Sequence, residues 1–423
     1  MKKKIISVVL AVSLLVPTAA VSAAGTQRMI TISDDVTVTM NGEKLNMTDA
    51  QGNPVEAFTY DGITYLPARA VLEASGNAIS WDGENKVASI TTKEDNMQNP
   101  NLANVAEEKD KYYIFDLDEN VNRTHVTYKN RYGIELSADL YASKDLDETK
   151  TYPAIVVGPP YGGVKEQGPG VYANQLAQRG FVVLAFDPSY NGESGGAPRH
   201  LSTPEIFSED FSAGVDFLGS LKYVNRDQIG AIGICGSGGF ALSAAAMDTR
   251  IKAVATAAMY DISGMGATMD NDSRRQMLTS MSEQRWTDFE NGEPAYTRNY
   301  PSDKPLDELP NTLTGTNEEW WTFYGMKRGW HPNSGGSFTN TSMIPFTNYS
   351  LLQHIDSISP RPILFITGDI AHSRSMSEGF YAQAAEPKEL YIVDGAMHID
   401  LYDDVEKIPF DKLENFFKDA FNK

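Results

Sequence analysis

Residues 230–240, G-A-I-G-I-C-G-S-G-G-F, join an apolar segment to a run of small residues and hold the chain's single cysteine, Cys235. The apolar residues 229–234 predict a buried strand, and the glycines that follow predict a tight turn into a helix. Such a turn strains its central residue and requires small neighbours two positions away on either side. Gly233 and Ser237 stand at those positions. We therefore predict that Cys235 projects from a strand-turn-helix bend, as a nucleophile would.

Two other interpretations of this stretch stay open. In the first, Ser237 is the nucleophile, with Cys235 and Gly239 as its small neighbours, but this leaves Gly233 without a role inside a strand. In the second, Cys235 is a buried and inert thiol, since free cysteine often serves as a small core residue. Chemistry favours an active Cys235, because a helix start and a nearby imidazole both stabilise the thiolate that attacks a carbonyl.

The general base is expected near the end of the chain. Residues 389–403, E-L-Y-I-V-D-G-A-M-H-I-D-L-Y-D, predict a strand followed by a loop that carries His398, one of only six histidines. A late loop histidine after an apolar strand is typical of the base in proteins with this kind of bend. We therefore expect the His398 imidazole within hydrogen-bonding distance of the Cys235 thiol. The alternative is a loop histidine that caps a neighbouring aspartate.

A carboxylate should complete the catalytic triad, and two candidates remain. Residues 362–368, P-I-L-F-I-T-G, predict a strand that ends next to Asp369, which gives the chain order nucleophile, acid, histidine. Glu378 is the alternative acid, and either carboxylate can instead cap a turn or a helix. His372 lies between them in the sequence and could be a second imidazole in the site, although we favour a surface loop for it.

The reaction's oxyanion needs two backbone N–H donors. Gly236, directly after the nucleophile, is expected to supply one. The second is expected in V-V-G-P-P-Y-G-G, after the strand that ends at residue 158. Because Pro159 and Pro160 lack an N–H group, Tyr161 is the first residue there that can donate. The loop at residues 187–195, D-P-S-Y-N-G-E-S-G, is interpreted as structural.

Strands and helices alternate around these motifs. After a hairpin at residues 125–141, strands are predicted at residues 154–158, 181–186 and 229–234. Each is followed by a predicted helix or preceded by one, at residues 170–179, 204–221 and 238–247. This alternation predicts an α/β protein with a doubly wound, mainly parallel sheet. Residues 259–359 then separate two predicted strands and are too long for a plain loop. We interpret them as an inserted helical cap, whose aromatic residues are expected to fill its core.

The chain before this domain divides into three parts. The first residues, M-K-K-K and an apolar run broken by Pro17, predict a secretory signal peptide rather than a membrane anchor. The next part has short alternating segments and the turn Asn41-Gly42, which predict a small α+β domain with hairpins. Because of the predicted signal peptide, we expect a protein that is secreted or associated with the cell surface. The predicted parts are a signal peptide at 1–24, a small domain at 28–93, a linker at 94–112 and the second domain at 113–423.

Composition limits the partners. The net charge is −20, and loss of the three lysines at positions 2 to 4 with the signal peptide changes it from −20 to −23. Such a protein repels phosphate backbones, so nucleic acid is excluded as an expected partner. The single cysteine excludes an internal disulfide bond, and stability must therefore come from packed cores.

The motifs resemble two known families. The segments G-P-P-Y-G-G-V-K-E-Q, A-F-D-P-S-Y-N-G-E-S-G-G, G-I-C-G-S-G-G and P-K-E-L-Y-I-V-D-G-A-M-H-I-D-L-Y-D resemble α/β-hydrolases, especially the dienelactone hydrolase-like branch with cysteine at the bend. The segments N-G-E-K, G-I-T-Y-L-P-A-R-A-V and S-W-D in residues 28–93 resemble the copper amine oxidase-like N-terminal stalk domain. No histidine precedes His125, so this domain offers no imidazole to bind copper, and we expect a spacer or a module that contacts the cell wall.

The first resemblance implies a hydrolase that cleaves an ester, lactone or related acyl bond in a small-molecule substrate, with no metal and no organic cofactor. The sequence departs from that family at Pro159, where relatives commonly have His or Gly, and at Ala371, where many relatives have the acid. Two alternatives therefore stand beside hydrolysis. One is acyl transfer to an alcohol or amine, and the other is a cell-envelope binding protein whose hydrolase domain is weak or inactive.

Overall fold

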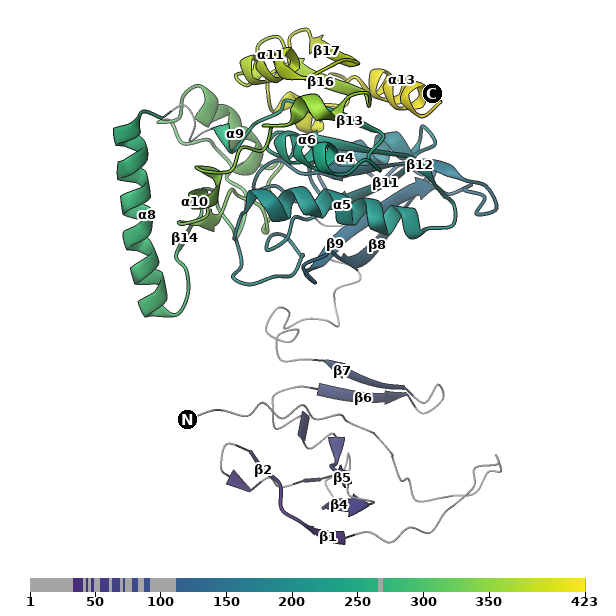
Figure 1. Cartoon of the computed structure of the whole chain (residues 1–423), viewed down its shortest axis with the longest axis vertical. Coiled ribbons are helices and arrows are strands. Elements are labelled where there is room, and N and C mark those ends of the chain that lie inside the picture. Colours follow the sequence, from purple (N-terminus) through teal and green to yellow (C-terminus); the bar gives the residue numbers. More distant parts are fainter. Residues whose placement is uncertain are drawn as a thin grey trace. The chain divides into compact units, whose positions relative to one another are not determined.

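The computed structural model describes residues 112–264 and 269–422, and before them stretches between residues 33 and 91. The chain forms two compact units, Met1–Lys109 and Asp110–Lys423 (Figure 1). The predicted signal peptide and all but the last residue of the predicted linker lie outside the described residues. Among the helices that are described, none is long and apolar enough to cross a membrane.

The first unit is built from short antiparallel strands. Phe58 and Tyr65, on neighbouring strands, stack with their ring centroids 5.0 Å apart. The predicted hairpin around residues 41 and 42 is flanked by paired strands, since Met40 lies opposite Glu43. The described strands are β1 (Ser33–Val36), β4 (Ala57–Tyr60) and β5 (Ile63–Tyr65) in one sheet, the pair β2 (Thr39–Met40) and β3 (Glu43–Lys44), and the pair β6 (Ala78–Asp82) and β7 (Val87–Thr91).

The second unit is organised around one eight-stranded sheet in the order β17-β16-β13-β12-β10-β11-β9-β8. Its strands are β8 (Val121–Lys129), β9 (Glu135–Ser143), β10 (Tyr152–Gly158), β11 (Val182–Phe186), β12 (Val224–Ile234), β13 (Ala253–Ala257), β16 (Ile363–Gly368) and β17 (Lys388–Val393). The β8–β9 and β9–β11 pairs are antiparallel, whereas the strands from β11 to β17 pair in parallel. The predicted fold class, a doubly wound and mainly parallel α/β sheet, is confirmed.

Helices cover both faces of this sheet, because its central strands are apolar on both sides. In β10, Val156 belongs to the core on one face and Ile155 to the core on the other. Residues of α5 (Pro204–Ser220), α6 (Ser237–Met247) and α11 (Arg374–Gln383) pack into the first core. Residues of α4 (Gly168–Ala177) and α13 (Phe410–Phe421) pack into the second. Parallel strands bring their carboxyl ends to one edge, where ligands bind in such sheets.

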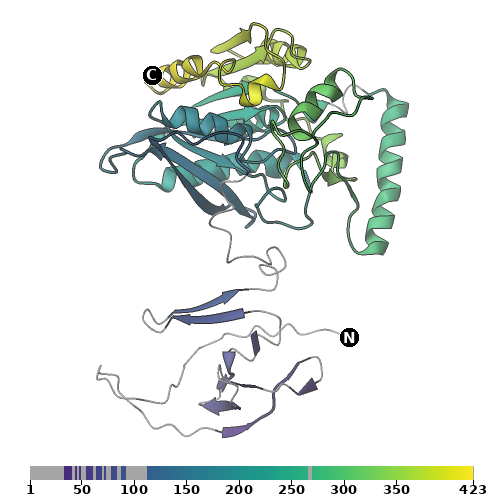
Figure 2. The ribbon, with the colours of Figure 1, turned by 180° about the vertical axis from the view of Figure 1, so that it is seen from behind.

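The predicted cap lies between β13 and β16. It contains helices and also a short strand pair, namely α8 (Asn271–Asn291), β14 (Tyr296–Thr297), α9 (Thr316–Tyr324), β15 (Phe338–Thr339), α10 (Met343–Phe346) and the 3-10 helix η1 (Ile355–Ile358). Phe323 and Tyr324 of α9 are buried in the core that also contains Cys235, as expected of cap aromatics. By contrast, Figures 1 and 2 both show α8 at the outer edge of the unit.

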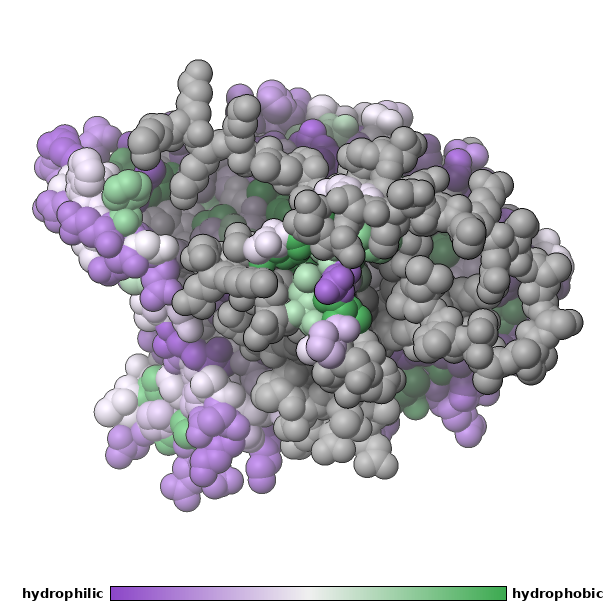
Figure 3. Space-filling model, turned by 90° about the horizontal axis from the view of Figure 1, so that it is seen from below, coloured by the Kyte–Doolittle hydropathy of each residue, from purple (hydrophilic) through white to green (hydrophobic). Residues whose placement is uncertain are grey.

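Charged residues make up 22% of the chain, and hydrophilic side chains predominate among the described residues at the rim of the face drawn in Figure 3.

Candidate active site

Cys235 occupies a strained bend between β12 and α6. Its φ angle is 53°, in the left-handed region that side chains other than glycine rarely adopt. The bend is fixed on both sides, because the Cys235 N–H donates to the Ala257 carbonyl (2.9 Å) and the Cys235 carbonyl accepts from Gly238 N–H (2.9 Å). A Cβ atom at Gly233 would lie 2.1 Å from the Ser237 carbonyl oxygen, so only glycine fits beneath the turn. The predicted strand-turn-helix bend is therefore present, with Cys235 at its centre.

Ser237, the alternative nucleophile, has a different environment. It is the first residue of α6 and is 4% exposed. Its Oγ would lie 2.9 Å from a Cβ atom built on Gly158, in the interior beneath the bend. The strained backbone position belongs to Cys235 instead, which favours Cys235 as the nucleophile.

The two predicted oxyanion donors both reach the Cys235 sulfur. Burial raises the pKa of the Cys235 thiol, while hydrogen bonds from the Tyr402 hydroxyl and from the backbone N–H groups of Gly236 and Tyr161 lower it. A Cβ atom at Gly236 would lie 2.7 Å from the Tyr161 Cβ, so glycine permits this close approach of the two loops. The Tyr161 ring stacks on Phe338 of β15 at 4.0 Å, which ties the donor loop to the cap. Two backbone N–H groups thus converge at the Cys235 sulfur.

The predicted base, His398, is fully buried in the same site, but it does not contact the thiol directly. Its Nε2 lies 3.0 Å from the Tyr402 hydroxyl, which also hydrogen-bonds Cys235. No hydrogen bond joins His398 to Cys235 in the described part of the chain, so the expected direct contact is replaced by a bridge through Tyr402. Burial, and then the neighbouring His372, hold the pKa of His398 well below its ordinary value. The imidazole is therefore neutral at pH 7.

Neither predicted acid is hydrogen-bonded to His398. Nδ1 of His398 lies 2.6 Å from the Ser373 hydroxyl, at the place where a triad carboxylate is expected. Asp369 Oδ1 is buried without a hydrogen-bond partner, and Glu378 pairs with Arg374 at 2.8 Å. The structure thus corrects the expected contact: a neutral hydroxyl orients the imidazole in place of a carboxylate. A proton on Nδ1 would be donated to Ser373, which leaves Nε2 free to accept.

A carboxylate does reach the site, but it comes from the cap. Glu319 of α9 is 9% exposed and lies 3.0 Å from Nδ1 of His372 through its Oε2. The His372 ring stacks on His398 with centroids 4.4 Å apart, so the surface-loop assignment of His372 is wrong. The other oxygen of Glu319 accepts the backbone N–H of Ile399 (2.9 Å). Glu319 therefore fastens the cap to the loop that carries the base.

A buried ion network supports the Tyr161 loop. Among the described residues, the carboxylates of Glu166, Asp187 and Glu193 lie close enough together to hold a metal ion. The ammonium group of Lys165, 1% exposed, already pairs with all three, including Glu193 at 2.7 Å and Asp187 at 3.2 Å. One ammonium group faces three carboxylates, and burial raises the pKa of Glu166 and of Asp187. The network connects the Tyr161 loop to residues 187–195, which gives residues 187–195 the structural role expected of them.

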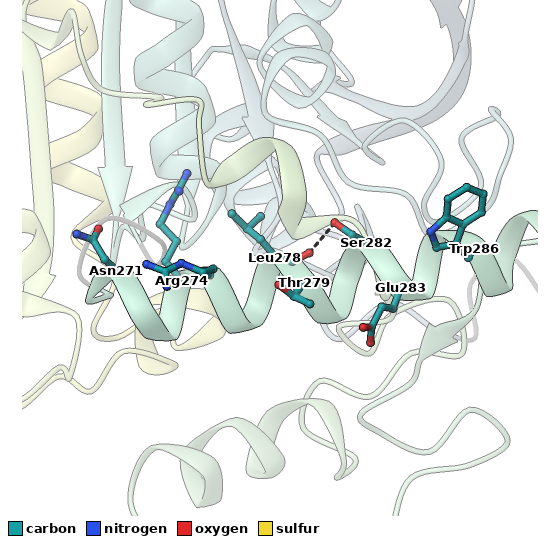
Figure 4. Close-up of a pocket in the computed structure, with 8 residues that line it drawn as sticks. Asn271, Arg274, Leu278, Thr279, Ser282, Glu283 and Trp286 are labelled. Carbon is teal, nitrogen blue, oxygen red and sulfur yellow. Dashed lines mark hydrogen bonds between the residues drawn. The ribbon is translucent and has the colours of Figure 1, made fainter.

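A groove elsewhere in the unit is separate from this site. It has a volume of about 470 Å³ and is lined by residues of α8. Figure 4 shows these side chains on successive turns of the helix, with the Ser282 hydroxyl donating to the Leu278 carbonyl (2.7 Å). None of its lining residues contacts Cys235 or His398, so the groove takes no part in the arrangement described above.

Two family models match the chain. The copper amine oxidase N-terminal domain matches residues 16–90 and 39–112, and X-Pro dipeptidyl-peptidase (S15 family) matches residues 132–332. The matched N-terminal residues contain no histidine and no cysteine, so their donor atoms do not suit a copper site. The second match includes Cys235 and ends before His398.

The chain is closely similar to two curated proteins, and a crystal structure of one of them has been solved. The protein PA2218 of Pseudomonas aeruginosa is 50% identical over 311 residues, which cover 72% of this chain and 82% of that protein. YcjY of Escherichia coli is 37% identical and covers 67% of this chain and 92% of that protein. The crystal structure of PA2218 matches with a TM-score of 0.69 and 47% identity, over 73% of this chain and 96% of that one.

More distant relatives carry names of enzymes. The α/β hydrolase GrgF of a Penicillium species has the same fold, with a TM-score of 0.60 at 24% identity over 71% of this chain and all of that one. The acyltransferase drtE of Aspergillus calidoustus is 25% identical, over 67% of this chain and 91% of that protein. The thiohydrolase aneE of Aspergillus aculeatus is 33% identical, over 29% of this chain and 37% of that protein.

Proposed function

The chain belongs to the family of PA2218 and YcjY and has the fold of a hydrolase-type enzyme, and from this premise we propose that it cleaves ester, thioester or lactone bonds through Cys235. One observation carries the proposal. The single thiol sits at φ 53° at the carboxyl edge of the sheet, and the N–H groups of Gly236 and Tyr161 converge on it. These are the parts that acyl transfer through a covalent intermediate requires.

The reaction begins when Cys235 loses its proton toward the neutral imidazole of His398. The Sγ lone pair then attacks the acyl carbonyl carbon, and the carbonyl oxygen becomes an oxyanion that the two N–H groups stabilise. As the tetrahedral intermediate collapses, the bond to the leaving alcohol or thiol breaks, and His398 returns the proton to it. A thioester on Cys235 remains. Water, deprotonated by His398, attacks this thioester, releases the acid and regenerates the thiol.

Hydrolysis of activated aryl esters and thioesters tests the proposal. We expect Cys235→Ala to lose ~10³-fold or more of kcat/KM, the scale of effect seen when a catalytic nucleophile is removed. Ser237→Ala is the matched control and should retain most activity, because the strained backbone position belongs to Cys235 and not to Ser237. An Xaa-Pro anilide belongs in the substrate panel, since the S15 family match names a dipeptidyl-peptidase. Undiminished ester hydrolysis by Cys235→Ala would overturn the assignment.

Acyl transfer is the second candidate, because the relative drtE is named an acyltransferase. The supporting feature in this chain is a reaction centre with little access to water, since Cys235 is 6% and His398 0% exposed. In such a site an acceptor alcohol or amine that reaches Cys235 competes with water for the thioester. Products formed with and without added acceptors distinguish the two reactions, because transfer yields a new ester or amide and hydrolysis yields only the acid.

The location of the enzyme is a separate proposal. The M-K-K-K start and apolar run of residues 1–24 support export, and the N-terminal unit then serves as a spacer or a cell-wall contact. Amino-terminal sequencing of the protein recovered outside the cytoplasm should begin near residue 24. Binding of the full mature chain to purified cell-wall material, compared with a chain that starts at residue 110, tests the second part.

A further inference from the structure

Tyr402 occupies the position between the proposed nucleophile and its base. It lies on α12 (Asp400–Asp403), four residues after His398, and is 1% exposed. Its hydroxyl is 3.0 Å from Nε2 of His398 and also hydrogen-bonds the Cys235 sulfur. The two reacting groups are therefore connected in the described structure by one phenolic oxygen.

We propose that Tyr402 is a further catalytic residue, which relays the proton between Cys235 and His398. The inference rests on the proposed role of Cys235 as nucleophile. In the forward step the S–H bond of Cys235 breaks and its proton passes to the Tyr402 oxygen. At the same time the phenolic O–H bond breaks and that proton passes to Nε2 of His398. The products are a thiolate, a neutral tyrosine and an imidazolium, so charge and protons balance.

The surroundings of Tyr402 suit a relay. Its ring packs edge-on against Phe323 at 5.2 Å, which fixes the direction of the hydroxyl. Burial, and then the nearby Cys235 and Tyr324, hold the pKa of Tyr402 well above its ordinary value. The phenol therefore stays protonated at neutral pH, and it can donate one proton only while it accepts another. A base in direct contact with the thiol would not need this group.

The single cysteine allows the relay to be measured without a substrate. We would follow alkylation of Cys235 by iodoacetamide from pH 6 to pH 11, by mass spectrometry of the full chain. Tyr402→Phe should shift the midpoint of the rate profile upward by about one pH unit, and at pH 7 this corresponds to a roughly tenfold slower reaction. His398→Gln should slow alkylation similarly. The double variant should be no slower than either single variant, because both residues act on one proton path.

Tyr172→Phe is the matched control. The Tyr172 hydroxyl is also buried and donates to the Leu401 carbonyl on the same short helix (2.8 Å), but it is not hydrogen-bonded to the thiol or the imidazole. We expect its alkylation profile to match that of the wild type. An unshifted profile for Tyr402→Phe, or faster alkylation at every pH, would overturn the relay, and the second result would mean that the tyrosine only shields the sulfur.

The two proposals can fail independently. If Cys235→Ala retains ester hydrolysis, the proposed function fails, whatever the alkylation profiles show. If Cys235→Ala is inactive and Tyr402→Phe has a wild-type profile, the function stands and the relay fails.

Discussion

The hydroxyl of Ser373 lies 2.6 Å from Nδ1 of His398, in the place where a catalytic triad has a carboxylate. Ser373 is 1% exposed, so the contact is shielded from water. A neutral hydroxyl fixes the tautomer and orientation of an imidazole, but it stabilises the imidazolium less than a carboxylate does. The His398 imidazole is therefore positioned by hydrogen bonding and buried without a paired negative charge.

Removing this contact should weaken the base. We expect Ser373→Ala to lower kcat/KM about two- to tenfold, since a neutral hydrogen bond contributes ~0.5–1.5 kcal/mol. Asp369→Asn and Glu378→Gln should have smaller effects, because neither carboxylate is hydrogen-bonded to His398. Steady-state kinetics on one ester decides the matter. Loss of activity confined to Asp369→Asn would instead identify Asp369 as the acid.

Alanine substitutions at Gly233 and Gly379 together test the geometry of the bend. At Gly233 a new Cβ would lie 2.1 Å from a backbone oxygen, whereas at Gly379, within α11, nothing lies within 4 Å. Gly233→Ala should therefore destabilise the fold by several kcal/mol or prevent its formation. Gly379→Ala should stabilise it by ~0.5–1 kcal/mol, because alanine favours a helix more than glycine does. Thermal unfolding compares the two, and a tolerated alanine at Gly233 would contradict the geometry of the bend.

The cap should contribute to both stability and activity through Glu319. Glu319→Ala removes the partner of His372 and leaves the buried N–H of Ile399 unpaired, at a cost of ~1–3 kcal/mol. We expect a lower melting temperature together with reduced kcat, because the loop that carries His398 loses its contact with the cap. The adjacent, exposed Glu318→Ala is the control. Equal effects of the two substitutions would show that the contact with the cap is unimportant.

Stability should fall in mild acid because of buried neutral histidines. Burial, and then Lys165, lower the pKa of His331 from 6.5 to about 3. In the unfolded chain the His331 imidazole binds a proton below pH 6.5, but in the folded chain it does so only below about pH 3. The stability that this neutral imidazole contributes is therefore lost as the pH falls from 6.5 toward 3. The slope is ~1.4 kcal/mol per pH unit for one group.

His331→Asn tests this linkage. It removes the titrating group while an amide can still accept the Asn333 N–H that His331 Nδ1 accepts at 3.1 Å. Melting temperatures of the variant and the wild type, measured from pH 7 to pH 5, should therefore converge as the pH falls. Parallel curves would show that His331 does not titrate between the folded and unfolded states.

Much of the site could be predicted because it lies at the ends of parallel strands. The apolar run before Cys235 locates β12, and the runs before Tyr161 and His398 locate β10 and β17. Once the alternation of strands and helices indicates a parallel sheet, these ends must share one edge. The two proline residues before Tyr161 then leave that residue as the first N–H donor in its loop. Local patterns thus predicted the bend at Cys235, the two loops whose N–H groups approach its sulfur and the loop that carries His398.

The partners of His398 could not be predicted in the same way. Ser373 and Tyr402 depend on how two loops pack, and Glu319 comes from the cap, 80 residues from its partner Ile399. Chain order favoured Asp369, but the order of residues does not determine which side chain reaches Nδ1. One signal was available, since Tyr402 follows His398 by four residues, the spacing that places two side chains on one face of a helix.

The most direct test is to look for an acyl group on the sulfur. The full chain would be mixed with an activated aryl ester, quenched in acid within the first turnovers, and analysed by intact and peptide mass spectrometry. We expect one added acyl group, located on Cys235 and absent from Cys235→Ala. An acyl group on Ser237 or on another residue would contradict the role of Cys235 as nucleophile. So would turnover without any covalent adduct, if the Cys235→Ala variant still hydrolyses the ester.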